Sequence, residues 1–349
     1  MQSLQIDHQI ISPTTSTFVI AEIGVNHDGS VERALELVSH AKDCGADAVK
    51  LQIFNARTLM HASTAFATYQ ANRCNESSAV EMLEAYELSP EELKLVVEAI
   101  REAGMLPIAT PFSLEDVDTV SQLNLPAIKI ASPDLVNRPL LQRAASQKKP
   151  LLVSTGASTI EEIDQTVKWL TDWNSPFALL HCISAYPTKD VDANLCWITE
   201  LAAKFKTIVG YSDHTNDILA GALAVSAGAR IIEKHLTYDC QAQGPDHSAS
   251  FNPAEFKQYV ELIRRAQLLS GTPGRRVLPV EQDVRKVSRQ SLVLRRPIKI
   301  GQQIAEADLA IQRPGTGIPA ADMTKVVGKS AAMAIPAGTL LTWDMLHAA

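Results

Sequence analysis

Short apolar segments recur along the chain, separated by stretches in which apolar residues return every three or four positions. The apolar segments are six to eight residues long and rich in Val, Ile, Leu and Ala. Their length and β-branched content predict eight buried strands. These segments cover residues 18–24, 46–52, 105–111, 127–132, 150–156, 177–184, 207–214 and 230–237.

The intervening stretches carry residues typical of helix boundaries. One of them begins with Ser89 and Pro90, an N-cap residue followed by a residue favoured at the first helical position, and it ends at Gly104. Three others have similar boundaries and the same apolar period. The four helices predicted in this way cover residues 30–45, 89–104, 158–170 and 252–271.

The alternation of strands and helices predicts a parallel sheet. Eight such units over about 250 residues match a (β/α)₈ TIM barrel, an α/β fold. The alternative is a doubly wound open sheet. No G-x-G-x-x-G motif follows the first strand, which argues against the dinucleotide-binding version of that fold.

One connection, between the second and third predicted strands, is much longer than the others. Within it, residues 54–77 have no clear period, and we expect a loop over the open end of the barrel. Four side chains of this loop are candidates for substrate contact, with a solvated loop as the alternative. They are His61, Tyr69, Asn72 and Arg73.

The pattern changes after Gly271. We predict a barrel domain over residues 1–275, a linker over 276–288 and a small β-rich domain over 289–349. Within the last domain, residues 298–309 resemble residues 335–346 at an offset of 37. Ile298 then aligns with Ile335 and Gly301 with Gly338, followed by the pairs Ile304 and Leu341, and Leu309 and Leu346. This repeat predicts pseudo-twofold character.

Composition narrows the class of protein. The chain has 349 residues, of which 46% are apolar and 20% charged, and its formal net charge is −7. Such a balance argues against a general nucleic-acid or anionic-membrane surface. No apolar run approaches the ~20 residues of a membrane span, and the N-terminus has no secretory pattern. Five scattered cysteines without a C-x-x-C pair indicate free thiols and a cytoplasmic protein.

Polar residues gather where the predicted strands end, which is where (β/α)₈ barrels hold their chemistry. Lys50 and Lys129 provide two ammonium groups, and four hydroxyl residues end other strands. Cations with short hydroxyl donors suit a phosphate or a carboxylate, whereas solvated lysines at strand ends are the alternative. The four hydroxyl residues are Thr110, Ser132, Ser154 and Ser212.

Two histidines end neighbouring strands. Residues two apart on a strand share a face, so His214 and His235 can both point into the barrel. They can bind a divalent metal or act as an acid/base pair, and their spacing does not decide between the two. Glu22 and Glu233 could serve as general acid/base groups or orient the histidines.

Together these residues form motifs that resemble the sialic acid (N-acetylneuraminate) synthase family of nonulosonate synthases. These enzymes condense phosphoenolpyruvate with an N-acetylmannosamine-type sugar. The segment IQRPGTGIP also resembles the antifreeze-like SAF (β-clip) domain of those enzymes. The barrel motifs are AEIGVNHDG, KLQ, TPF, KIAS, STG, HCISAYPT, GYSDHT, EKHLT and GPDHSASFNP.

The resemblance implies a metal-dependent transferase that forms a C–C bond and works as a domain-swapped homodimer. His214 and His235 would bind the metal, usually manganese, with magnesium or cobalt as alternatives. Lys50, Thr110, Lys129, Ser132, Ser154 and Ser212 would bind phosphoenolpyruvate. Gln52, Tyr186, Asp246 and Arg313 would contact the sugar, with Glu22 and Glu233 near the chemistry. Two further substrate-binding candidates depart from the family pattern: Ser184 replaces a common Asn, and Asp134 replaces a common Glu.

N-acetylneuraminate is the expected product. Legionaminic or another nonulosonic acid, or use of a 6-phosphorylated sugar, is the alternative within the family. Two other classes remain open. Lys50 or Lys129 could form a Schiff base in a lyase-type aldolase, or the chain could be a non-catalytic binder of a surface or a carbohydrate.

Overall fold

The computed structural model describes residues 3–61, 78–272 and 274–347. The chain divides into two compact units, Met1–Thr272 and Pro273–Ala349. Among the described residues, no helix is both long and apolar enough to cross a membrane.

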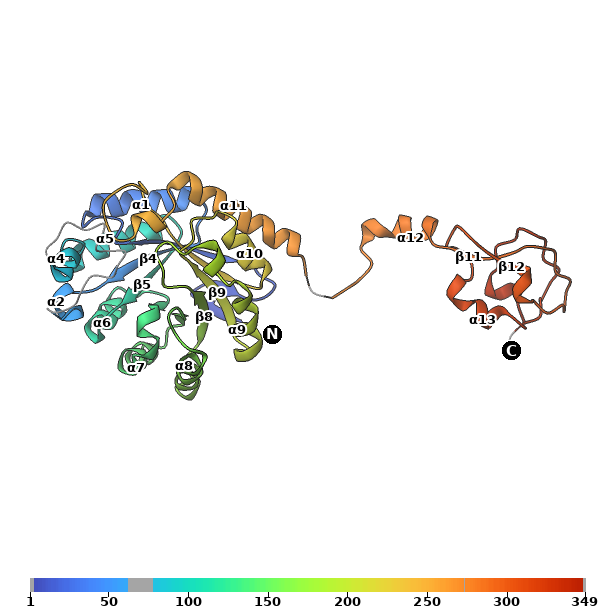
Figure 1. Cartoon of the computed structure of the whole chain (residues 1–349), viewed down its shortest axis with the longest axis horizontal. Helices are drawn as coiled ribbons and strands as arrows, with labels where there is room; N and C mark the ends of the chain where they lie inside the picture. Colours follow the sequence, from blue (N-terminus) through green and yellow to red (C-terminus); the bar gives the residue numbers. More distant parts are fainter. Residues whose placement is uncertain (1–2, 62–77, 273, 348–349) are drawn as a thin grey trace. The chain divides into compact units, whose positions relative to one another are not determined.

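The first unit is a closed barrel of eight parallel strands surrounded by helices (Figure 1). The barrel is closed because its last strand pairs with both the strand before it and the first barrel strand. The predicted (β/α)₈ barrel is confirmed, and the open sheet is wrong. The strands are β3 (Phe18–Gly24), β4 (Ala48–Ile53), β5 (Leu106–Pro111), β6 (Ile128–Ile130), β7 (Leu151–Ser154), β8 (Phe177–Cys182), β9 (Ile208–Asp213) and β10 (Ile231–His235).

Each barrel strand is followed by a helix whose apolar face packs on the strands. Side-chain capping begins many of these helices. Ser89 and Glu92 form a reciprocal capping box at the start of α5, as the Ser-Pro sequence led us to expect. The helices are α1 (Val31–Asp43), α5 (Pro90–Glu102), α6 (Leu114–Gln122), α7 (Arg138–Ser146), α8 (Ile160–Asp172), α9 (Cys196–Phe205), α10 (Ala220–Ser226) and α11 (Pro253–Ser270).

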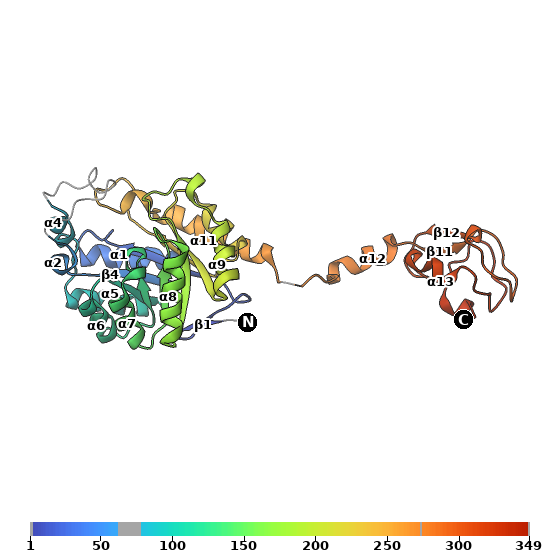
Figure 2. The ribbon, with the colours of Figure 1, turned by 60° about the horizontal axis from the view of Figure 1, so that its bottom comes forward.

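A β-hairpin that the sequence analysis missed lies at the amino-terminal end of the barrel (Figure 2). It consists of β1 (Leu4–Ile6) and β2 (Gln9–Ile11). Leu4, Ile6 and Ile11 join the same apolar cluster as the inward residues at the strand starts. The hairpin therefore covers the end of the barrel core opposite the carboxyl ends of the strands.

The long connection after β4 contains a short helix, α2 (Ala56–Leu59), within residues 54–77, where a loop was expected. In the described part of this connection, α4 (Ala79–Glu84) lies beyond the expected loop, and Arg57 of α2 forms an ion pair with Glu84. His61 follows α2. Tyr69, Asn72 and Arg73 lie outside the described residues.

Alternation along β10 separates its three ionisable side chains. Glu233 and His235 face the barrel interior, whereas Lys234 points to the opposite face and is fully buried. Its ammonium group donates to the main-chain oxygens of Thr215 and Ala249 and lies 4.2 Å from the ring centre of Phe251. Lys234 thus ties the loops after β9 and β10 to the barrel wall.

The second unit is built around a small antiparallel sheet of β11 (Ser291–Leu294) and β12 (Leu309–Gln312). It also contains α12 (Gln282–Ser288), within the predicted linker, and α13 (Met323–Val326). Short 3₁₀ helices occur in both units. They are η1 (Ser132–Val136), η2 (Asp190–Asp192), η3 (His247–Ala249), η4 (Pro279–Glu281), η5 (Glu306–Asp308), η6 (Ala320–Asp322) and η7 (Trp343–Met345).

The internal repeat of this unit is confirmed. Ile298 and Ile335, the first aligned pair, exchange two main-chain hydrogen bonds of 2.9 Å, as residues related by a twofold axis would. Gly301 and Gly338 share a positive φ, of 75° and 76°. The helices η5 and η7 also lie 37 positions apart. The two halves therefore repeat the same backbone path around one apolar cluster.

We expect Lys234→Met to lower the free energy of unfolding by about 2–4 kcal/mol, because two buried carbonyl groups lose a charged donor. Urea denaturation of both proteins measures the difference. Lys94→Met is the matched control, because the Lys94 side chain is 69% exposed. Equal stability of the Lys234 variant and the wild type would contradict this role.

Candidate active site

A cavity of about 240 Å³ lies at the carboxyl ends of the barrel strands. Its wall combines residues from strand ends with residues from the loops that follow them. Twelve of the sixteen residues predicted for the site line this cavity. They are Lys50, Gln52, Thr110, Lys129, Ser132, Ser154, Tyr186, Ser212, His214, Glu233, His235 and Asp246.

The first charged group of the cavity is an ion pair between Lys50 and Glu22. Lys50 also donates to the Thr110 hydroxyl at 2.9 Å, and Gln52 donates to Glu22 Oε1 at 3.1 Å. Glu22 is fully buried below the lining. Gly24 lies above it with a φ of 45°, and a Cβ there would stand 2.7 Å from Glu22 Oε1, so only glycine fits.

The second charged group joins Lys129 to Glu233. The Lys129 ammonium lies 3.7 Å from Glu233 Oε1 and donates to the Ser154 hydroxyl at 2.7 Å. Ser212 donates to the same oxygen of Glu233 at 2.8 Å. The other oxygen, Oε2, is buried and receives no hydrogen bond from the described residues. It is therefore available to a bound molecule.

Burial and charge act in opposite directions on these groups. Burial opposes ionisation of Glu233, but Lys129 and Lys50 outweigh it and hold the pKa of that carboxyl below its usual value. Burial lowers the pKa of Lys50 to about 8, against the opposing charge of Glu233. The ion pair with Glu22 further favours the protonated lysine. Glu233 therefore stays ionised at neutral pH, and Lys50 loses its charge only at alkaline pH.

The two histidines face each other, with their ring centres 5.5 Å apart, and Tyr186 packs 4.0 Å from the His214 ring. His214 Nδ1 lies 3.0 Å from the Ile183 carbonyl oxygen, which can only accept. Nδ1 therefore carries a proton, and Nε2 is the nitrogen that the neutral ring would offer to a metal. Burial keeps the pKa of His235 well below its usual value, so this ring is neutral and offers a lone pair. Burial acts to lower the pKa of His214, but the neighbouring Cys182 outweighs it and raises that pKa.

Four predicted residues do not line the cavity. Glu22 lies beneath it, and Ser184 is exposed beside Gly156, where a Cβ would stand 2.4 Å from its hydroxyl. Asp134, in η1, accepts a hydrogen bond of 3.0 Å from Asn137. Arg313 is exposed in the second unit.

Several lining residues were not singled out from the sequence. Cys182 ends β8, and its sulfur lies 3.8 Å from His214 Nδ1. The motifs HCIS and TPF contain two of these residues, but an apolar or thiol side chain at a strand end gives no chemical indication of a site. The others form an apolar side of the cavity, in which the Phe54 and Phe112 rings meet edge to face at 6.2 Å. These apolar residues are Val25, Phe54, Leu59, Leu83, Ala131, Phe112, Pro133 and Pro245.

The fold and the cavity define a class: a (β/α)₈-barrel protein with paired buried charges and two facing histidines at the carboxyl ends of its strands. Residues 37–274 match the model of the NeuB family, and residues 289–347 match that of the SAF domain. The chain belongs to the NeuB family and carries a carboxyl-terminal SAF domain. This confirms the family and the fold that the sequence motifs indicated.

Curated and solved relatives agree with this assignment. The chain is 41% identical to the N,N'-diacetyllegionaminic acid synthase of Legionella pneumophila, over 95% of both chains. It is 30% identical to the N-acetylneuraminate-9-phosphate synthase of Mus musculus, over 91% of this chain and 89% of that protein. The crystal structure of the N-acetylneuraminic acid synthetase of Leptospira borgpetersenii has a TM-score of 0.74 and 32% identity, covering 81% of this chain and 95% of that one. These relatives are nonulosonic acid synthases.

We expect the affinity of the cavity for phosphoenolpyruvate, the anion that the motifs imply, to fall roughly tenfold as the pH rises through about 8. The reason is that Lys50 is charged below its pKa and neutral above it. Removing the neighbouring carboxylate in Glu22→Gln should move this fall to lower pH. Calorimetry between pH 7 and 9.5 measures both effects.

Glu36→Gln is the control for that experiment, because the Glu36 side chain is 59% exposed on α1. The pH at which it loses affinity should equal that of the wild type. A constant affinity up to pH 9.5, or the same midpoint in Glu22→Gln and wild type, would contradict the assignment of Lys50.

Proposed function

We propose that the chain condenses phosphoenolpyruvate with an N-acetylated amino sugar and releases phosphate to give a nonulosonic acid. The observation that carries this proposal is the arrangement of two buried lysine–glutamate groups beside two facing histidines in one cavity. The names of the relatives support the same reaction class.

The lysine side of the cavity suits phosphoenolpyruvate. Lys50 and Lys129 come from β4 and β6, and each already donates to a hydroxyl group that can turn toward a ligand. Ser132 and Ser212, which also carry hydroxyl groups, line the same cavity. Charge-assisted contacts of this kind hold both the phosphate and the carboxylate of a small dianion.

The facing histidines support a divalent metal. Their ring centres lie 5.5 Å apart, and Asp246 Oδ2 lies 3.8 Å from His235 Nδ1, so the donor types that such an ion takes are close together. His214 and His235 would hold it, with manganese proposed and magnesium or cobalt as alternatives. Such an ion supplies Lewis acidity for the sugar aldehyde oxygen.

The protein side chains carry the remaining steps. The C3 carbon of phosphoenolpyruvate attacks the aldehyde carbon of the open-chain sugar, and positive charge develops at C2. Glu233 would stabilise that charge, because it lines the cavity and its Oε2 receives no hydrogen bond from the described residues. Glu22 is engaged by Lys50 and Gln52, so we assign it to orienting them. Water then adds at C2, and the tetrahedral intermediate loses phosphate.

The sugar is proposed to lie toward Gln52, Tyr186 and Asp246. N-acetylneuraminate is the product expected from the motifs. The apolar side with Phe54 and Phe112 favours the alternative, a 6-deoxy acceptor of the legionaminic type, because a methyl group is better matched to that wall than a hydroxymethyl or phosphate group.

The direct test follows phosphate release with phosphoenolpyruvate and a panel of acceptors: N-acetylmannosamine, its 6-phosphate and 2,4-diacetamido-2,4,6-trideoxyhexoses. We expect one acceptor to give phosphate and a new C–C bond. Chelation should abolish this activity, added manganese should restore it, and His214→Ala should lose metal binding and activity together.

Three outcomes would contradict the proposal. Phosphate release that persists in a verified metal-free preparation would show that the reaction does not require a metal. A borohydride-trapped adduct with pyruvate would favour the Schiff-base aldolase at Lys50 or Lys129. Carbohydrate binding without turnover of any acceptor would favour a non-catalytic protein.

We also propose a domain-swapped homodimer in which the SAF domain contributes Arg313 to the barrel of its partner. The support is the family resemblance and the exposed position of Arg313 at the end of β12. The planar guanidinium suits sugar oxygens approached from outside a barrel.

This arrangement predicts complementation. Arg313→Ala and His235→Ala should each lose at least roughly 90% of activity. A loss of this size is expected when one charged hydrogen-bond donor or one metal ligand is removed. Mixed dimers prepared by co-refolding should regain one working site, built from an intact barrel and an intact partner arginine. Verified heterodimers without activity would rule out the exchange of SAF domains between subunits. Wild-type activity of Arg313→Ala would rule out a role of Arg313 in the site.

A further inference from the structure

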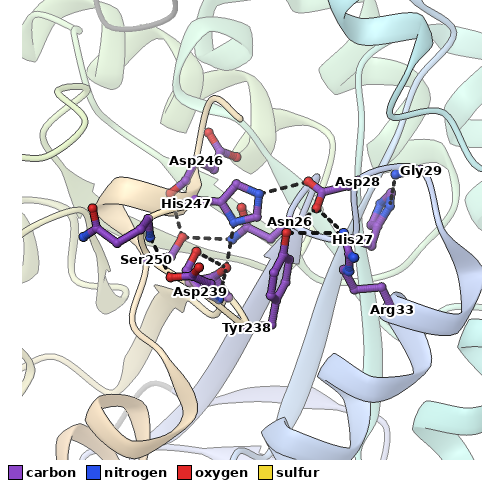
Figure 3. A network of polar contacts seen from close by, with 12 residues as sticks. Asn26, His27, Asp28, Gly29, Arg33, Tyr238, Asp239, Asp246, His247 and Ser250 are labelled. Carbon is purple, nitrogen blue, oxygen red and sulfur yellow. Dashed lines mark hydrogen bonds and ion pairs between the residues drawn. The ribbon is translucent and has the colours of Figure 1, made fainter. Parts of the chain in front are cut away.

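A polar network outside the cavity joins the loop after β3 to the loop after β10 (Figure 3). Its centre is Asp28, which accepts hydrogen bonds from His247 Nε2 at 2.9 Å, the Tyr238 hydroxyl at 2.8 Å and Arg33. Burial opposes ionisation of Asp28, but the three donors outweigh it and hold its pKa below the usual value. The Asp28 carboxylate is therefore ionised and held in place by its three hydrogen-bond donors.

His247 is held at both ring nitrogens. Its side chain is only 1% exposed, and Nδ1 lies 2.7 Å from the Thr237 hydroxyl. Nε2–H donates to Asp28, so both ring nitrogens have a hydrogen-bonding partner. Gly244 fits closely against this ring, since a Cβ there would stand 2.7 Å from His247 Cδ2. The loop is therefore closely packed around His247.

Asp246, the residue before His247, lines the cavity, yet no described residue donates a hydrogen bond to its carboxylate. Its Oδ2 lies 3.8 Å from His235 Nδ1, which is itself buried without a hydrogen bond in the described structure. The main-chain oxygen of Asp246 accepts from the Ser250 hydroxyl at 2.7 Å, and that hydroxyl accepts from Asn26 at 2.9 Å. Neighbouring residues, not its own hydrogen bonds, therefore set where this carboxylate points.

We infer that Asp28 and His247 are positioning residues, which brace the loop after β10 so that the Asp246 carboxylate faces the cavity opposite His235 and receives hydroxyl groups of the acceptor sugar. The inference rests on the proposed function for the identity of the ligand. Lys234 holds the same loop at Ala249, and the Asp28–His247 contact holds it next to Asp246.

The experiment compares His247→Leu, which loses both ring contacts, with His247→Gln, whose amide can still donate toward Asp28. Asp28→Asn provides a variant that keeps the backbone conformation, because Asn tolerates the positive φ of 51° at this position. Asp47→Asn is the matched control. Asp47 accepts from Arg264 at 2.7 Å at the amino-terminal end of the barrel, away from the cavity.

We expect His247→Leu to raise the KM for the acceptor at least tenfold while the KM for phosphoenolpyruvate stays within twofold. His247→Gln should recover most of this loss, and Asp47→Asn should change neither constant. Equal rises in both KM values, or an unchanged acceptor KM in both His247→Leu and Asp28→Asn, would overturn the inference.

Hydrogen exchange provides a readout that does not depend on turnover. Amides of residues 244–250 should exchange at least tenfold faster in Asp28→Asn than in the wild type, with the amides of β4 unchanged. If the wild type turns over no acceptor, the proposed function fails. The exchange measurement alone then tests whether Asp28 and His247 hold the loop after β10. Unchanged exchange at residues 244–250 would overturn it.

Discussion

Lysine ammonium groups buried inside a barrel need carboxylates beside them, because an unpaired buried charge is strongly destabilising. The structure meets this constraint through strand order. Glu22 and Lys50 are partners in register on β3 and β4. Glu233, the partner of Lys129, stands on β10, which becomes a neighbour of β3 only when the barrel closes. The charged cavity therefore depends on closure, and closure depends on the apolar strand faces that pack against the helices.

Much of this fold could be predicted from the sequence because buried parallel strands are continuous apolar runs, and the segment 18–24 coincides with β3. The hairpin β1–β2 could not, since strands of three residues have too little pattern to distinguish them from a loop. The same limit applies to the short helix α2 in the connection after β4.

The candidate site was likewise predictable from the sequence only in part. A period of two placed Lys50 with Gln52 and Glu233 with His235 on the inner face, and all four line the cavity. Asp134 and Ser184 follow the ends of their strands, where the chain direction depends on loop contacts that no period describes. Pairings such as Lys129 with Glu233 join residues more than a hundred positions apart, so only the closed barrel reveals them.

We propose that the lysine–glutamate groups make the cavity a phosphoenolpyruvate site. The decisive test is calorimetric titration of phosphoenolpyruvate into Lys129→Met and Lys129→Met/Glu233→Gln, since the double variant removes the cation without leaving a carboxylate unpaired. We expect both variants to lose affinity by roughly ten- to a hundredfold, the scale of one charge-assisted hydrogen bond to an anion. Wild-type affinity in the double variant would contradict the claim.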